Sequence, residues 1–169
     1  MKKIALFLLI LNLITTFAFA QTIRYVKPGG TGNGTSWANA SGNIQNMIDA
    51  SNAGAQVWIA GESYPLSATI EIKNGVNVYG GFFGNETSIS ARPKSDLDGN
   101  GTIEPWEFTH TTVLNGQNAI RVLNQASNFA VETVWDGVRI YNGRITTISA
   151  FGAVVQYQIV WLVKIQLLP

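Results

Sequence analysis

Short apolar segments separated by turn residues constrain the fold of this 169-residue chain more than any other feature. Residues 57–59, 70–72 and 76–79 are rich in apolar side chains, and Gly, Asn, Lys or Pro ends each segment. β-Strands this short would give an ordinary sandwich little margin of stability. They suit a coil in which each turn of the chain stacks on the next.

The same rhythm resumes in the second half of the chain. Residues 112–116, 120–124 and 134–140 are further short segments in which Asn or Gly follows apolar residues. Like positions of successive turns align in a solenoid, so the recurring Asn side chains are expected to form ladders. The pattern therefore predicts a parallel β-solenoid.

The segment before the first apolar burst is expected to cap this solenoid. Residues 22–26 alternate polar and apolar side chains and predict a short strand, which a Gly-rich loop follows. Ile44, Met47 and Ile48 lie at i, i+3 and i+4 and predict one short amphipathic helix with these side chains inward. Trp37 is a large apolar residue suited to covering the open end of the stack.

Composition narrows the classes of partner and chemistry. The formal net charge is only +1, and Lys2 and Lys3 at the N-terminus contribute two of the positive charges. The remaining chain has no basic field of the kind that binds nucleic acid, so we expect no nucleic-acid partner. The absence of cysteine excludes disulfides, thiol catalysis and cysteine zinc sites.

The N-terminus has the three parts of a signal peptide. Met-Lys-Lys is followed by an apolar run over residues 4–14 and by Ala-Phe-Ala at positions 18–20. An uncleaved membrane anchor is the alternative, but the run is shorter than the ~20 residues that span a bilayer. We therefore expect residues 1–20 to be removed before Gln21. The mature protein is expected to be secreted or at the cell surface, with no stable membrane span.

Three segments carry a resemblance to a known family. Residues 25–37 read YVKPGGTGNGTSW, residues 56–60 read QVWIA and residues 77–82 read NVYGGF. They resemble the N-terminal part of bacterial secreted right-handed parallel β-helix proteins of the pectate-lyase-like and polymorphic outer-membrane-protein-like kinds, over residues 23–143. The resemblance implies an all-β fold, the N-terminal portion of a right-handed parallel β-helix (solenoid) with one short capping α-helix. It implies an exported, often cell-surface protein and no single reaction.

One insertion carries recognisable metal chemistry. Residues 96–107, Asp-Leu-Asp-Gly-Asn-Gly-Thr-Ile-Glu-Pro-Trp-Glu, follow the twelve-position pattern of an EF-hand calcium loop. The expected Ca²⁺ ligands are Asp96, Asp98, Asn100, the carbonyl of Thr102, Glu104 through a water molecule, and Glu107 through both carboxylate oxygens. Arg-Pro-Lys-Ser at positions 92–95 cannot supply an entering helix, so we expect an isolated loop. The alternative is an acidic, Gly-rich surface excursion between two rungs.

The expected organisation has four parts. They are a signal peptide at residues 1–20, an N-terminal cap at residues 21–55, the first β-helix rungs with the calcium loop at residues 56–143, and an aberrant tail at residues 144–169. The tail lacks the recurring Asn and Gly residues that follow the earlier apolar segments. A frameshift near Gly143 would explain it and would make the chain a truncated fragment of a longer β-helix. The alternative is a genuine amphipathic final strand.

Two functions of different class fit these features. In the first, the solenoid is an exported non-enzymatic surface or adhesive module that binds a glycan or a surface protein. In the second, it is the N-terminal part of a calcium-dependent polysaccharide lyase or glycoside hydrolase. Glu104 and Glu107 could serve there as acid and base, but the calcium pattern already accounts for both. His110, the only histidine, has no partner in a nucleophile motif, so the sequence assigns no catalytic residue.

Overall fold

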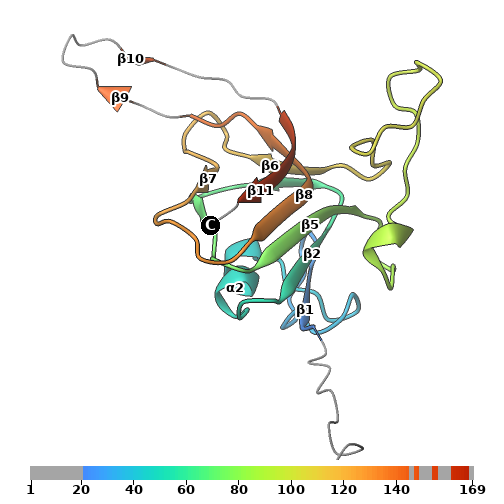
Figure 1. The fold of residues 1–169 in the computed structure, drawn as a ribbon, viewed down its shortest axis with the longest axis horizontal. Helices are drawn as coiled ribbons and strands as arrows, with labels where there is room; N and C mark the ends of the chain where they lie inside the picture. The colour runs from blue at the N-terminus through green and yellow to red at the C-terminus, as the bar shows by residue number, and fades with distance from the viewer. Residues whose placement is uncertain (1–20, 145–146, 149–153, 156–160, 168–169) are drawn as a thin grey trace, which may run out of the picture.

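The computed structural model describes residues 21–144, 147–148, 154–155 and 161–167 (Figure 1). The expected signal peptide, residues 1–20, lies outside the described residues, as do parts of the tail. Within the described ranges the regular structure is mostly β-strand with one short α-helix, as predicted. None of the helices in these ranges is long and apolar enough to cross a membrane.

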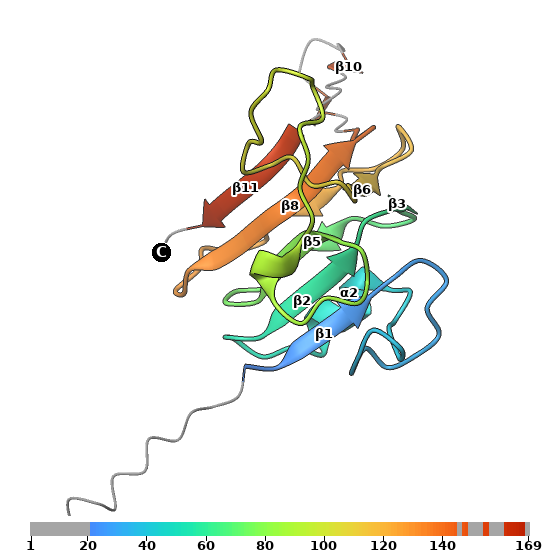
Figure 2. The ribbon, with the colours of Figure 1, turned by 90° about the vertical axis from the view of Figure 1, so that its right-hand side faces the viewer.

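The principal sheet is built from parallel strands. Its order is β1 (Ile23–Val26), β2 (Gln56–Ala60), β5 (Asn77–Phe82), β8 (Thr133–Tyr141), β6 (Thr112–Asn115) and β3 (Ser63–Pro65), with every neighbouring pair parallel. Strand β11 (Trp161–Leu167) also pairs with β8, but antiparallel. Figure 2 shows β1, β2 and β8 pointing the same way and β11 pointing the opposite way. The predicted parallel pairing is therefore confirmed for the principal sheet.

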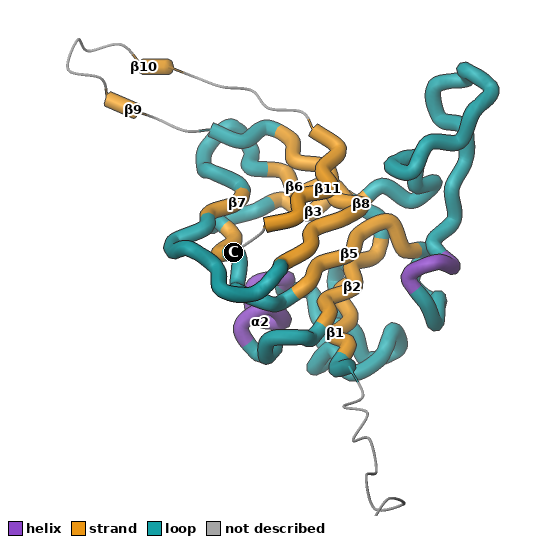
Figure 3. Tube along the Cα trace, viewed as in Figure 1, coloured by secondary structure: helices purple, strands orange, loops and turns teal. Residues whose placement is uncertain are grey.

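Two smaller pairings complete the strand structure. β4 (Ile70–Glu71) pairs parallel with β7 (Leu123–Asn124), and β9 (Thr147–Ile148) pairs antiparallel with β10 (Val154–Val155). The helix α2 (Ile44–Asp49) packs against β1, β2 and β4, and the 3₁₀ turn η1 (Ile89–Ala91) follows β5 along the chain (Figure 3).

Alternation along the strands separates an inner face of the sheet, which lies in the core, from an outer, aromatic one. On the inner face, Val57, Val78 and Trp135 occupy one register across β2, β5 and β8, and all three are fully buried in the core. On the outer face, Tyr25 and Trp58 are in register, with an edge-to-face ring contact of 5.7 Å between centroids. Because the strands pair in register, side chains of the same face lie in line across the sheet.

The N-terminal cap covers the edge of β1. The backbone N–H of Tyr25 donates to the carbonyl of Gly34, and its carbonyl accepts from Ser41 N–H. The edge that would otherwise leave unpaired N–H and C=O groups is thereby paired with a loop. Helix α2 begins at Ile44 because the Asn43 side chain accepts a hydrogen bond from Asn46 N–H at 2.9 Å.

The helix buries the predicted residues, but Trp37 lies elsewhere than expected. Ile44, Met47 and Ile48 are all buried in the core. The Trp37 ring packs on Tyr25 and Phe82 over the outer aromatic face of the sheet, and it does not cover the end of the inner core. Its indole N–H donates to a backbone carbonyl in the loop after β5, which fixes the ring on this face.

Two strands differ from the sequence expectation. Residues 120–124 yield only the short strand β7, because residues 117–118 adopt positive φ and the N–H of Ile120 bonds back to Gly116, so the turn reaches residue 120. Strand β3 was not predicted, because Tyr64, between Ser63 and Pro65, is its only strand-favouring side chain. Pairing with β6 forms this strand despite its weak local signal.

Candidate metal centre

The predicted calcium loop sits at the tip of an excursion between β5 and β6. Its two sides meet at an antiparallel bridge between Lys94 and Phe108, and Thr109 N–H donates to the carbonyl of Pro93 at 2.9 Å. Figure 1 shows this yellow-green excursion projecting from the sheet beyond η1. The loop is therefore held at its neck and open to solvent at its tip.

Arg92 anchors the neck of the excursion to the sheet. Its guanidinium donates to the carbonyls of Gly80 and Ile89, both at 2.9 Å, and forms a 2.8 Å ion pair with Asp136 of β8. It also lies over the Phe108 ring, 4.3 Å from the centroid. With a side chain only 6 % exposed, Arg92 connects β5, β8 and both sides of the excursion.

Three of the predicted ligands converge. One carboxylate oxygen from each of Asp96, Asp98 and Glu107 lies within 4.8 Å of the others, the only such cluster of at least three His, Cys, Asp or Glu residues in the described part of the chain. Hard divalent cations prefer oxygen ligands of this kind. The structure thus brings together the first, third and twelfth positions of the loop.

Backbone amides hold the Asp96 carboxylate at the start of the loop. It accepts hydrogen bonds from the N–H groups of Gly101 and Gly99, both at 2.7 Å, and from that of Asn100 at 3.2 Å. These bonds, the one from Gly101 foremost, lower the pKa of Asp96. Gly101 has φ +87°, a left-handed conformation that a side chain would strain, so the turn around Asp96 requires glycine.

The Glu107 carboxylate closes the loop from its other end. It is 4 % exposed and accepts hydrogen bonds from Leu97 N–H at 2.8 Å and Glu104 N–H at 2.9 Å. The Glu104 N–H contributes most to lowering the pKa of Glu107. Glu107 therefore stays ionised and links the first and last turns of the loop.

The remaining predicted ligands form one connected group. The Asn100 side-chain amide donates to Asp98 and to Glu104, at 3.1 Å each, and its oxygen accepts from Thr102 N–H at 2.8 Å. Asn100 lowers the pKa of Glu104, but the neighbouring Glu107 carboxylate and desolvation together raise it above the ordinary value.

One oxygen of this group is left without a partner. Glu104 Oε2 is buried and makes no hydrogen bond with any described residue. A buried carboxylate oxygen without a donor is unfavourable, and a calcium-bound water molecule, the contact predicted for Glu104, would satisfy it. The donor set, entirely oxygen and mostly carboxylate, fits Ca²⁺.

Sequence reasoning missed two features. Leu97, Ile103 and Trp106 expose 57, 56 and 56 % of their surface on the same loop, and only their apolar character in an acidic segment could have signalled this. A cavity beside α2 was also missed, because it is formed by three segments that no motif connects.

Comparison with known proteins adds no assignment. The chain matches no protein-family model, no curated protein and no solved structure. The resemblance to secreted parallel β-helix proteins therefore rests on the three segments quoted above and stays a prediction.

Proposed function

We propose that the chain is the N-terminal portion of a right-handed parallel β-helix that acts as an exported, non-enzymatic surface or adhesive module carrying a Ca²⁺ loop. The observation that carries this proposal is the order in which strands pair. β2, β3 and β4 follow one another along the chain, and β5, β6 and β7 then pair parallel with them in the same order.

This repetition is what a three-sided coil requires. β8 continues it, because its first half pairs with β5 through Val78 and Trp135, and its second half pairs with β6 through Leu114 and Ile140. Each turn of a solenoid stacks on the previous one and buries a shared core. In this arrangement the calcium loop is an insertion at the corner between the first and second sides of the second turn.

Calcium is proposed to order this insertion. Asp96, Asp98 and Glu107 would hold the ion directly, with Asn100, the Thr102 carbonyl and Glu104 completing the oxygen set. An isolated loop of this kind is expected to bind with a dissociation constant of roughly 10⁻⁴ to 10⁻³ M, the range of extracellular modules.

Titration calorimetry tests the calcium assignment. The wild-type chain is expected to give one binding isotherm, and Asp96→Ala combined with Glu107→Gln is expected to abolish it. Glu132→Gln, at an exposed carboxylate outside the loop, is the matched control and should bind as the wild type does. Equal calcium heats for the wild type and the double variant would refute the assignment.

The surface role is supported by the shape of the excursion. The loop projects from the sheet and presents Leu97, Ile103 and Trp106 to solvent, where a partner could cover them. A fluorescent form of the protein is expected to bind bacterial or host cell surfaces, or immobilised glycans, more tightly with calcium than with a chelator. Binding to none of these surfaces under either condition would reject the adhesive role.

A second candidate is a calcium-dependent polysaccharide lyase or glycoside hydrolase. It is favoured by one observation: Glu104 and Glu107 lie side by side, with the Glu104 N–H donating to the Glu107 carboxylate at 2.9 Å, and an acid and base pair requires two neighbouring carboxyl groups. Activity assays on acidic and neutral polysaccharides, with and without calcium, discriminate the two. Release of reducing or unsaturated ends that Glu104→Gln eliminates would favour the enzyme.

A further inference from the structure

A cavity of about 360 Å³ lies beside α2, on a part of the chain that contributes no residue to the calcium loop. Its walls come from the turn after β1 at residues 28–29, the start of α2 at residues 42–45, and the segment from β3 to β4 at residues 63–70. Its volume is at the lower end of the range of about 300 to 1,000 Å³ found for small-ligand sites. The space suits one ring of a ligand.

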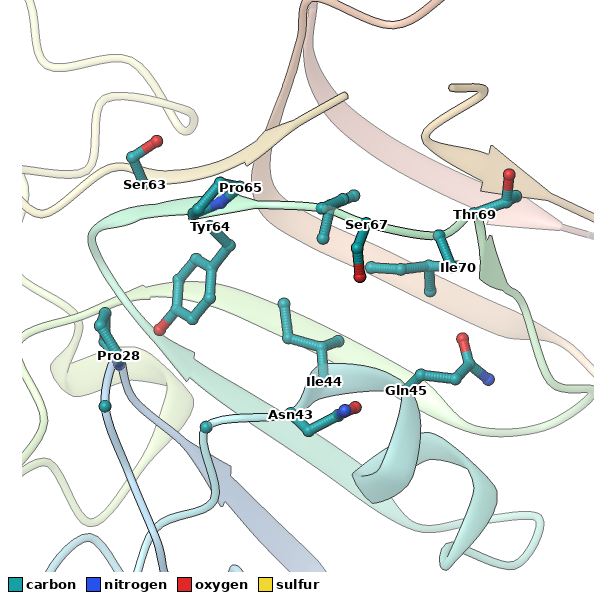
Figure 4. Close-up of a pocket in the computed structure, with 14 residues that line it drawn as sticks. Pro28, Asn43, Ile44, Gln45, Ser63, Tyr64, Pro65, Ser67, Thr69 and Ile70 are labelled. Carbon is teal, nitrogen blue, oxygen red and sulfur yellow. The ribbon is translucent and has the colours of Figure 1, made fainter. Parts of the chain in front are cut away.

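The floor of the cavity is apolar and fixed. Figure 4 shows Tyr64 from β3, Ile44 from α2 and Ile70 from β4 directed toward the same space. Each is at most 6 % exposed. The Tyr64 hydroxyl donates to the Ala60 carbonyl at 3.0 Å, which holds the ring in place. A ligand would meet a surface that needs little ordering on binding.

The rim offers hydrogen-bonding groups that the described residues leave unused. Ser67 is exposed, and its hydroxyl points into the space in Figure 4 and bonds to no other described residue. Asn43 uses its side-chain oxygen to cap α2, while its amide nitrogen donates to no described atom. Together these groups provide a hydroxyl and two N–H donors beside an apolar floor.

The cavity carries no charge. Its lining consists of Gly, Pro, Ala, Ile, Leu, Ser, Thr, Tyr, Asn and Gln, with no Asp, Glu, Lys, Arg or His. The Tyr64 hydroxyl is neutral as well, because burial raises its pKa well above the ordinary value. A phosphate or carboxylate ligand would find no cation here, whereas a neutral ligand with hydroxyl groups and an apolar face matches both floor and rim.

We propose that this cavity binds one neutral sugar ring of a surface glycan, with its apolar face over Tyr64, Ile44 and Ile70 and its hydroxyl groups toward Ser67 and Asn43. This inference rests on the proposed surface role and names the class of ligand for it. Because the cavity and the calcium loop share no residue, sugar binding is expected to be independent of calcium.

Two-dimensional amide NMR of the full chain tests the proposal, with glucose, galactose, mannose and N-acetylglucosamine as neutral probes and galacturonate as the acidic one. At least one neutral sugar is expected to shift resonances of residues 43–45 and 64–70 with millimolar affinity, in calcium and in chelator alike. Galacturonate is expected to cause no such shifts. No neutral sugar shifting these resonances, or galacturonate binding equally well, would overturn the proposal.

Three variants connect the shifts to the cavity. Ser67→Phe places a ring in the space and should abolish them, while Ser127→Phe, at an exposed serine outside the cavity, should leave them unchanged. Asn43→Asp keeps an oxygen that can cap α2 but removes the amide donors, and should weaken binding by about tenfold. Wild-type affinity in both Ser67→Phe and Asn43→Asp would place the sugar elsewhere.

The outcome is separable from that of the proposed function. If the protein binds cell surfaces and Ser67→Phe does not reduce that binding, the surface role stands and the sugar cavity is rejected. If neutral sugars shift the cavity resonances but no cell surface or glycan is bound, the adhesive role is rejected and the cavity stands.

Discussion

Arg92 should contribute more to stability than any other charged side chain on the excursion, because it joins the excursion to two strands. Arg92→Met removes the ion pair with Asp136 and the hydrogen bonds to the Gly80 and Ile89 carbonyls, while keeping apolar contact with Phe108. Breaking a buried ion pair from one side typically costs about 3 to 5 kcal/mol. The Asp136 side chain is 21 % exposed and regains some hydration, so we expect a loss of about 3 kcal/mol in unfolding free energy.

Urea unfolding followed by tryptophan fluorescence measures this loss. Arg121→Met is the matched control, because Arg121 is exposed and its guanidinium donates only to the Asn124 side chain, and it should change stability by about 0.5 kcal/mol or less. Adding Asp136→Asn to Arg92→Met should cost less than the sum of the single changes, since the pair is coupled. Equal stability of Arg92→Met and Arg121→Met would refute the role given to Arg92.

Three further outcomes follow from the structure. Leu114→Ala, at a fully buried position in the core, should lower the unfolding free energy by about 2 to 5 kcal/mol in the same urea assay. Its control, Leu97→Ala at an exposed position, should change the unfolding free energy by about 0.5 kcal/mol or less. Calcium affinity in calorimetry should decrease as pH falls and should begin to do so above pH 4.5. The neighbouring Glu107 carboxylate and desolvation raise the pKa of Glu104 from that value, and a protonated Glu104 accepts more weakly from the calcium-bound water; constant affinity down to pH 4.5 would contradict this. Mass spectrometry of the exported protein should find Gln21 at its N-terminus, and a chain retaining Met1 would show that the leader is not cleaved.

The sequence predicted the parts of the fold whose local pattern and tertiary environment agree. Ile44, Met47 and Ile48 have helical spacing and are buried on one face, and residues 56–60 and 77–82 are short strands that pair in parallel, as predicted. Strand β3 could not be predicted because its pairing partner β6 lies about fifty residues away, and pairing over that distance overrides weak propensity.

The candidate metal centre also has features that the sequence predicted and features that it could not predict. The spacing of Asp96, Asp98 and Glu107 predicted three metal ligands, and the structure brings their carboxylates together. This was predictable because all three residues belong to one twelve-residue loop. Neither the Arg92 anchor nor the cavity beside α2 could be predicted, because each depends on segments that meet only in the folded chain. The position of Trp37 was wrong for a related reason: burial alone does not tell which face of a sheet a large side chain covers.

The most direct test of the account is a crystal structure of the chain grown with calcium, with the anomalous signal used to locate the ion. The account predicts one ion within the loop, at about 2.3 to 2.6 Å from oxygens of Asp96, Asp98 and Glu107, on an excursion inserted between two stacked turns of parallel strands. A loop without an ion at saturating calcium would contradict the site. A chain whose β5, β6 and β7 do not stack in order on β2, β3 and β4 would contradict the solenoid.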